Sequence, residues 1–109
     1  MFTKQADSGY RDLLEGVQMK TLAYGDKTLL AKFKLRKGAA IPVHNHMHEQ
    51  TGYMVAGKMR FTIGADSFEC EPGDTWCIPG EVAHGVEVLE DSVVVEVFSP
   101  VCEDYLPVT

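Results

Sequence analysis

The chain has little cysteine, no long apolar run and no excess of basic residues, and each shortage excludes a class of protein. Its three cysteines, Cys70, Cys77 and Cys102, are odd in number and lack Cys-x-x-Cys spacing, so we expect neither a disulfide framework nor a cysteine zinc site. No segment reaches the roughly 18 apolar residues of a membrane span, and the N-terminus lacks the apolar core of a signal peptide. We therefore expect a cytoplasmic protein with no membrane partner.

Positive charge is also scarce. Ten Lys and Arg against sixteen Asp and Glu give a net charge of −6, which disfavours nucleic acid as a partner. Phosphate-binding loops, dinucleotide fingerprints and Gly-x-Ser-x-Gly elbows are absent from the sequence. The segment HEQTG at 48–52 opens like a zinc-protease helix, but Gly52 stands where the second histidine belongs. A small molecule is the expected ligand.

Short stretches of alternating apolar and polar residues run along the chain, as in residues 29–35, where every second residue is apolar. Gly, Pro and Asp turn signals separate these stretches, including EDS at 90–92. The segment YRDLLEG at 10–16 is the one place whose pattern favours a helical turn or two. The 109 residues therefore predict one all-β domain over 1–109, a sandwich or barrel. The strand-like runs are 17–23, 29–35, 59–63, 67–70, 75–78, 86–89 and 92–98.

Residues 44–50, HNHMHEQ, hold three of the four histidines beside Glu49 and Gln50. A straight strand would spread these seven residues over roughly 20 Å, which is too far for one ion. A shared metal therefore requires the chain to turn near residues 47–49. His44 and His46, which share a strand face, are the firmest pair of candidate ligands, and His84 follows a Pro-Gly turn from which it could approach them. Spacing alone leaves His48, Glu49 and Gln50 open.

Together these residues resemble the cupin family. The first cupin motif is Gly, five residues, His-x-His, three or four residues, Glu, six residues, Gly. Here Gly38, His44, His46 and Gly57 keep that register, and Gln50 occupies the Glu position. The second motif is Gly, five residues, Pro-x-Gly, two residues, His. It is matched by three residues, while its second glycine has slipped by one to leave Glu81 in its place. The three matching residues are Gly73, Pro79 and His84.

The resemblance implies an all-β cupin fold, a double-stranded β-helix or jelly-roll barrel. It also implies one divalent transition metal, drawn from Zn, Fe, Ni, Mn, Co or Cu. The ligands that it implies are His44, His46, Gln50 and His84. Glu49 fits the motif counts less well, although its coordination in place of Gln50 is the competing interpretation, and His48 becomes a turn or pocket-rim residue. Because neutral ligands leave the charge of the ion in place, such a site should attract an anionic oxygen ligand.

The C-terminal segment EVFSPVC at 96–102 resembles a small-cupin group of pectin and alginate breakdown. That group opens unsaturated uronates to linear keto forms and reads Asp-Val-Phe-Ser-Pro-x-Arg in this place. The resemblance implies proton transfer by Glu96 and substrate binding by Phe98 and Cys102. Glu preserves the acid–base group of the family Asp, whereas Cys102 does not preserve the carboxylate clamp of the family Arg.

The sequence thus predicts a metal-binding cupin, leaning toward an enzyme that opens or isomerises a small anionic sugar-derived substrate. Two alternatives are an Fe-dependent cupin dioxygenase and a non-catalytic cupin that binds a small ligand. The resemblance also implies a homodimer.

Overall fold

A computed structural model describes residues 1–107, which form eight β-strands and one short 3-10 helix. No α-helix occurs among these residues, and none of their helical residues forms a segment with the length and hydropathy needed to cross a membrane. The elements are β1 (Arg11–Leu14), β2 (Val17–Tyr24), β3 (Leu29–Leu35), β4 (Ala40–His44), β5 (Glu49–Ile63), β6 (Asp66–Cys70), β7 (Thr75–Ile78), β8 (His84–Ser99) and η1 (Glu103–Tyr105).

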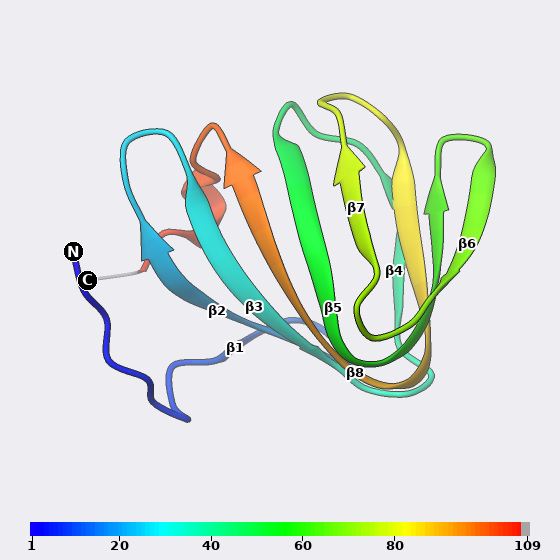
Figure 1. The fold of residues 1–109 in the computed structure, drawn as a ribbon, viewed down its shortest axis with the longest axis horizontal. Coiled ribbons are helices and arrows are strands. Elements are labelled where there is room, and N and C mark those ends of the chain that lie inside the picture. The colour runs from blue at the N-terminus through cyan, green and yellow to red at the C-terminus, as the bar shows by residue number, and fades with distance from the viewer. Residues whose placement is uncertain (108–109) are drawn as a thin grey trace.

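All strand pairs are antiparallel, in the order β1-β2-β3-β8-β5-β6, with β4 beside β8 and β7 beside β5. The long strands β5 and β8 pair over most of their lengths and serve both halves of the molecule, as Figure 1 shows. The ends of β8 and β5 near β3 and β7 belong to one half, and their other ends pair with β4 and β6 in the second half. This arrangement confirms the predicted all-β cupin fold.

A close approach of β5 and β8 lets both strands bend where the two halves meet. Their pairing loses register at three points between Met54 and Met59. Gly57 lies at this bend with a φ of 96°, and a Cβ atom there would lie 2.3 Å from the carbonyl oxygen of Asp91. Only glycine permits both the backbone angle and the contact.

The turn predicted at 90–92 is wrong, because β8 continues through these residues. A polar side chain at this point forms hydrogen bonds with backbone groups at the bend in the sheet. The Ser92 hydroxyl donates to the Glu90 carbonyl oxygen at 2.7 Å and accepts from the Lys58 N–H at 3.1 Å. Two strand-like runs that were separate in the sequence analysis are therefore one strand.

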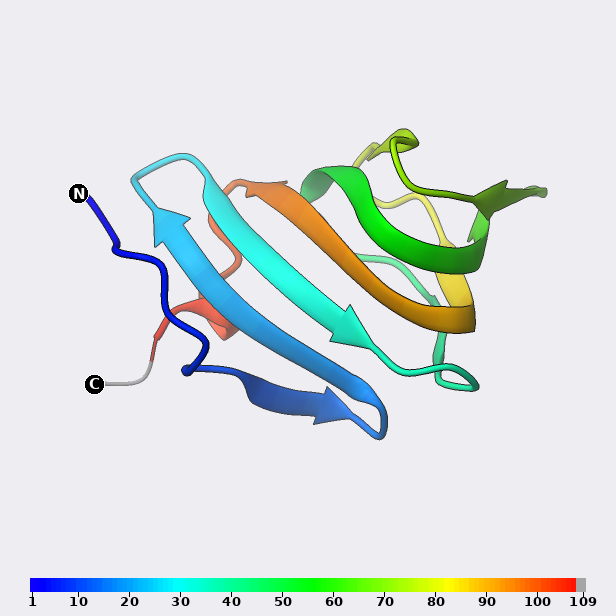
Figure 2. The same ribbon diagram turned by 60° about the horizontal axis from the view of Figure 1, so that its bottom comes forward.

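The helical turn predicted over residues 10–16 is also wrong, because residues 11–14 form β1. Pairing with β2 satisfies the backbone groups of this segment, with Arg11 opposite Met19. Arg11 and Leu13 are half-buried whereas Asp12 and Leu14 are exposed. Figure 2 shows β1, β2, β3, β8 and β5 side by side in one curved sheet.

Alternation along the strands builds the core. In β3 the buried positions are Leu29, Ala31, Phe33 and Leu35, and the residues between them face outward. Each buried large apolar side chain contributes about 1.5–3 kcal/mol relative to its exposed state. Most of the core lies between the two halves, around one cavity of about 410 Å³.

Candidate metal centre

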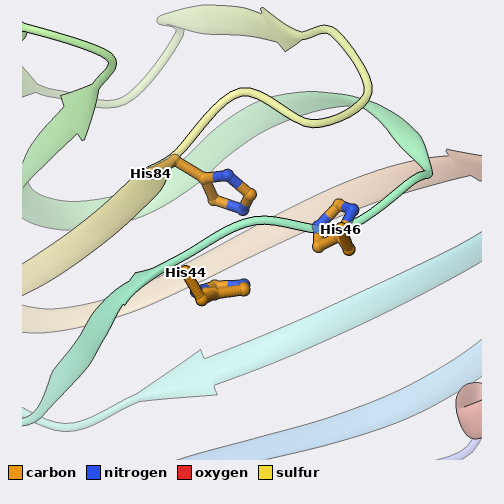
Figure 3. A group of neighbouring side chains, drawn as sticks. All are labelled: His44, His46 and His84. Carbon is orange, nitrogen blue, oxygen red and sulfur yellow. The ribbon is translucent and has the colours of Figure 1, made fainter.

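Three imidazoles lie close together, as Figure 3 shows, and all three line the cavity. His44 ends β4 and pairs across the sheet with His84, which begins β8, and His46 lies in the connection from β4 to β5. The ring centroids of His44 and His84 lie 4.4 Å apart, and those of His46 and His84 lie 4.9 Å apart. One nitrogen of each ring lies within 4.8 Å of the others. The chain turns between residues 44 and 49, as a shared site requires.

Backbone carbonyl groups orient two of these rings. His44 Nδ1 lies 2.9 Å from the Pro42 carbonyl oxygen, and His84 Nδ1 lies 2.9 Å from the Val82 carbonyl oxygen. A carbonyl oxygen only accepts, so Nδ1 carries the proton in both rings and Nε2 keeps its lone pair. Protein metal sites use the same arrangement to fix the tautomer of a ligand histidine.

His46 also offers a nitrogen to an ion. Its Nε2 lies 2.7 Å from Gln50 Oε1, while its Nδ1 is buried without a hydrogen-bond partner within residues 1–107. Metal–nitrogen bonds of about 2.1 Å keep ligand atoms within about 4.2 Å of one another. The 4.8 Å span of the three nitrogens is only slightly wider, so small side-chain rotations suffice. The donor set therefore fits a divalent transition metal.

A turn at residues 79–82 holds the backbone of His46. The N–H of Glu81 donates to the His46 carbonyl oxygen at 2.7 Å. Glu81 is the only non-glycine residue with positive φ in the described chain, at 68°. It occupies the position where the second cupin motif has its glycine, so the slipped motif leaves a strained residue beside the site.

Gln50 joins the imidazoles to a buried carboxylate. Its Nε2 donates to Glu96 Oε2 at 2.5 Å. An ionised carboxylate only accepts, so the amide must turn its N–H groups toward Glu96 and its carbonyl oxygen toward His46. A glutamate at position 50 would instead set two carboxylates against each other. The amide at Gln50 is therefore matched to the acid at Glu96.

A second donor reaches the same carboxylate oxygen across a glycine. Trp76 Nε1 donates to Glu96 Oε2 at 2.9 Å. Gly52 pairs with Trp76 on one side and with Glu96 on the other, so the indole must cross β5 at Gly52. A Cβ atom at Gly52 would lie 2.2 Å from Trp76 Cε2. The glycine thus provides the space through which the indole reaches Glu96.

Burial sets the protonation states in the site. It raises the pKa of Glu96, and the hydrogen bonds from Trp76 and Gln50 oppose that rise. Burial also lowers the pKa of His84, and the neighbouring His44 and His46 lower it further, although its bond to the Val82 carbonyl acts in the opposite direction. His84 is therefore held in the neutral form that binds metals.

The cavity extends from the imidazoles along an aromatic wall. Phe98 packs against His46 and Tyr105, with centroid distances of 6.3 Å and 5.2 Å. Burial raises the pKa of Tyr105 to about 12, so its hydroxyl remains protonated. The rest of the wall is largely apolar and includes Leu13, Val17, Phe33, Ile41, Met59 and Val86.

Most of the residues predicted for the site line the cavity, but Cys102 does not. His44, His46, Gln50, His84, Glu96 and Phe98 all line the cavity. Cys102 does not line it; its side chain is buried, and its carbonyl oxygen accepts a hydrogen bond from the Tyr105 N–H at 3.0 Å.

The two other residues considered as ligands, Glu49 and His48, lie outside the group of three imidazoles. Glu49 is exposed and accepts from the Cys77 thiol at 3.6 Å. His48 is half-buried, 5.5 Å from the His46 ring, and outside the group of three imidazoles.

Trp76 and Tyr105 were not among the residues predicted for the site. Trp76 donates to Glu96, and Tyr105 lines the cavity. The position of Trp76 within the second motif was the only available signal, because its contact with Glu96 depends on the register of three strands.

Comparisons with known proteins agree with this geometry. A family model described as "Cupin domain" matches residues 31–100. The pectin degradation protein KdgF of Dickeya dadantii (strain 3937) is 28% identical over 102 residues, which cover 92% of this chain and 93% of that protein. The structure of KdgF from Halomonas sp. has a TM-score of 0.91 and 30% identity, covering 97% of this chain and 100% of the other. An RmlC-like cupin from Shewanella frigidimarina NCIMB 400 also has a TM-score of 0.91, with 26% identity over 96% of this chain and 95% of its own.

Proposed function

The chain belongs to the cupin domain family and is related to the KdgF pectin degradation proteins, and from this premise we propose that it is a metal-dependent enzyme of uronate breakdown. The reaction is the opening of a small 4,5-unsaturated uronate to its linear keto form. His44, His46, His84 and Gln50 would hold the metal, and Glu96 would move the proton.

One observation supports this proposal above all others. Glu96 lines the same cavity as the three imidazoles and is linked to one of them, His46, through the side chain of Gln50. A buried carboxylate one side chain away from a metal centre can exchange a proton with a substrate held there. The relatives named for pectin degradation indicate which substrate class to test first.

The two oxygens of Glu96 are not equivalent. Trp76 and Gln50 both donate to Oε2, and no hydrogen bond to Oε1 is present within residues 1–107. Oε1 is therefore the atom available to a substrate in the cavity. Burial raises the pKa of this carboxyl above its ordinary value, and a raised pKa suits a carboxyl group that both takes and returns a proton.

The proposed step conserves all atoms. Glu96 Oε1 takes the proton of the anomeric hydroxyl, the C1 carbonyl forms, and the bond between C1 and the ring oxygen breaks. The electron pair left on the ring oxygen forms the C5 ketone as C4 of the former double bond takes the proton back from Glu96. A bound divalent metal supplies Lewis-acid stabilisation of the developing oxyanion. Because neutral ligands would leave the charge of the ion uncancelled, the site would also favour an anionic substrate.

Loss of ultraviolet absorbance from the conjugated double bond would measure the reaction. Protein loaded with Zn, Ni, Mn, Co or Fe(II) is mixed with an unsaturated galacturonate, and we expect a steady decrease in absorbance. Glu96→Gln should reduce the rate by at least about 100-fold, the scale of general acid–base catalysis. Glu90→Gln, an exposed change on the same strand, is the matched control. No decrease with any of these metals would refute the proposal.

The apolar wall of the cavity favours a second candidate. Much of it consists of aliphatic and aromatic side chains, such as Leu13, Val17 and Phe33, which suit a ligand with an apolar body. An Fe-dependent dioxygenase that acts on such a ligand is therefore our alternative proposal. Oxygen uptake by the Fe(II)-loaded protein with diketones would support it. A diketone that raises the melting temperature without oxygen uptake would instead indicate a non-catalytic binding protein.

A further inference from the structure

A cationic side chain lies against the wall of the cavity at Tyr105. The Arg11 guanidinium carbon is 6.0 Å from the centroid of the Tyr105 ring, and an Arg11 N–H donates to the Asp104 carbonyl oxygen. Tyr105 itself lines the cavity together with Glu96 and Phe98. Arg11 thus stands one ring away from the space in which the substrate would bind.

The position of Arg11 on β1 places it on the inner side of the sheet, near Tyr105. Arg11 and Leu13 are the half-buried residues of β1, with the exposed Asp12 between them, and Leu13 lines the cavity. The β1–β2 register shifts between Asp12 and Leu14, but Arg11 pairs directly with the buried Met19, and residues opposite each other in an antiparallel pair share a face. Burial raises the pKa of both Tyr105 and the Cys102 thiol, and the Arg11 charge opposes both rises.

Arg11 has hydrogen-bonding capacity to spare. Within residues 1–107 it forms no ion pair, because the ion pairs there involve Lys58 and Arg60 only. A guanidinium group has five N–H donors, and the contact with Asp104 uses one of its two terminal nitrogens. The remaining edge can bind a carboxylate in a bidentate manner.

Other cations are directed away from the cavity. No lysine or arginine of the described chain lines it. Lys32 and Lys34 alternate with the inward-facing Phe33 and Leu35 on β3, so they lie on the opposite face of the sheet. In a chain with a net charge of −6, Arg11 is a cation that contacts a residue of this wall and could attract an anion.

We propose that Arg11, held over Tyr105, binds the carboxylate of the substrate at the end of the cavity away from the metal. This inference rests on the proposed function, because it identifies the part of a uronate that this end of the site recognises. The sugar ring would then lie between Arg11 and the imidazoles, along Phe98 and Tyr105, with its anomeric hydroxyl toward Glu96.

Calorimetric binding of D-galacturonate and D-galactose to the Zn-loaded protein tests the inference without requiring turnover. The two sugars differ in the carboxylate, so we expect tighter binding of galacturonate. Arg11→Gln should weaken galacturonate binding by about 10- to 100-fold and leave galactose binding unchanged. Arg11→Lys keeps the charge but loses the bidentate geometry, so a smaller loss is expected. Arg36→Gln removes an exposed arginine outside this cavity and should bind both sugars like the parent protein.

Each outcome decides between the two proposals. If Arg11→Gln and Arg11→Lys both bind galacturonate like the parent protein, the carboxylate site is wrong. The same holds if the parent protein does not prefer galacturonate to galactose. If galacturonate binding depends on Arg11 but unsaturated uronates are not consumed, the carboxylate site stands and the proposed reaction fails. If unsaturated uronates are consumed with an unchanged KM in Arg11→Gln, the reaction stands and the carboxylate site fails. Melting temperatures identify a variant that fails to fold, in which case Arg11→Lys provides the comparison.

Discussion

The hydrogen bond from Trp76 to Glu96 can be removed without removing an aromatic ring. Trp76→Phe deletes the indole N–H that lies 2.9 Å from Glu96 Oε2 and keeps a ring against Phe61, whose centroid lies 5.0 Å from that of Trp76. The lost bond stabilises the ionised carboxylate and opposes the effect of burial. Its removal should therefore raise the pKa of Glu96 further.

The size of this shift follows from the strength of the bond. A hydrogen bond to a charged group contributes about 1.5–3 kcal/mol, and one pKa unit corresponds to about 1.4 kcal/mol. The pKa of Glu96 should rise by about 1–2 units in Trp76→Phe. Because Glu96 must be ionised to take the first proton, the acidic limb of the pH–rate profile should move to higher pH by that amount.

The assay is kcat/KM for unsaturated galacturonate as a function of pH, measured on protein with full metal content. Tyr53→Phe is the control, since it removes an exposed hydroxyl from the residue that pairs with β7 at Thr75. Trp76→Phe that folds normally and has the same acidic limb as the parent protein would refute the role of this bond.

Three further changes test other parts of the structure. Gly52→Ala places a Cβ atom 2.2 Å from the Trp76 ring, so it should displace the indole and shift the acidic limb as Trp76→Phe does; fully additive shifts in the double variant would contradict a shared cause. Glu81→Gly relieves a residue at φ 68° and should stabilise the fold by about 1 kcal/mol, seen as a rise in melting temperature of roughly 4–8 °C; a lower melting temperature would contradict the strain. Elemental analysis should show that His84→Ala loses most of its metal, and metal titration should show a roughly 10- to 100-fold weaker affinity in Gln50→Ala. The control variant His48→Ala should bind metal as the parent protein does. Unchanged metal binding in both His84→Ala and Gln50→Ala would refute the ligand set.

Periodicity predicted most strands correctly where one face of the strand is buried. The alternation in residues 29–35 reflects a strand with one face in the core, and the observed burial has the same period. The errors lie where local pattern competes with pairing. Residues 11–14 resemble a helix in isolation, but their pairing with β2 satisfies the backbone in a strand. The polar residues at 90–92 resemble a turn, but the strand β8 continues through them, and the Ser92 hydroxyl forms hydrogen bonds with backbone groups where the strand bends.

Local spacing and motif register determined the candidate ligands. His44 and His46 are two residues apart, and Gln50 and His84 follow from the spacing of the cupin motifs. Only the folded chain shows that one nitrogen from each of the three imidazoles lies within 4.8 Å of the others. It also shows that the Gln50 amide is oriented by Glu96.

Tertiary structure alone decided which other side chains serve the cavity. Trp76 reaches Glu96 because β7, β5 and β8 pair in one register and Gly52 leaves space between them. Arg11 reaches Tyr105 because the start of β1 packs against the C-terminal segment, where an Arg11 N–H donates to the Asp104 carbonyl oxygen. Sequence by itself determined the alternating strands and the ligand spacing, because both depend on neighbours within a few residues. Contacts between residues far apart in the chain depend on strand register and on the bend of the sheet, which arise only when all the strands pack together.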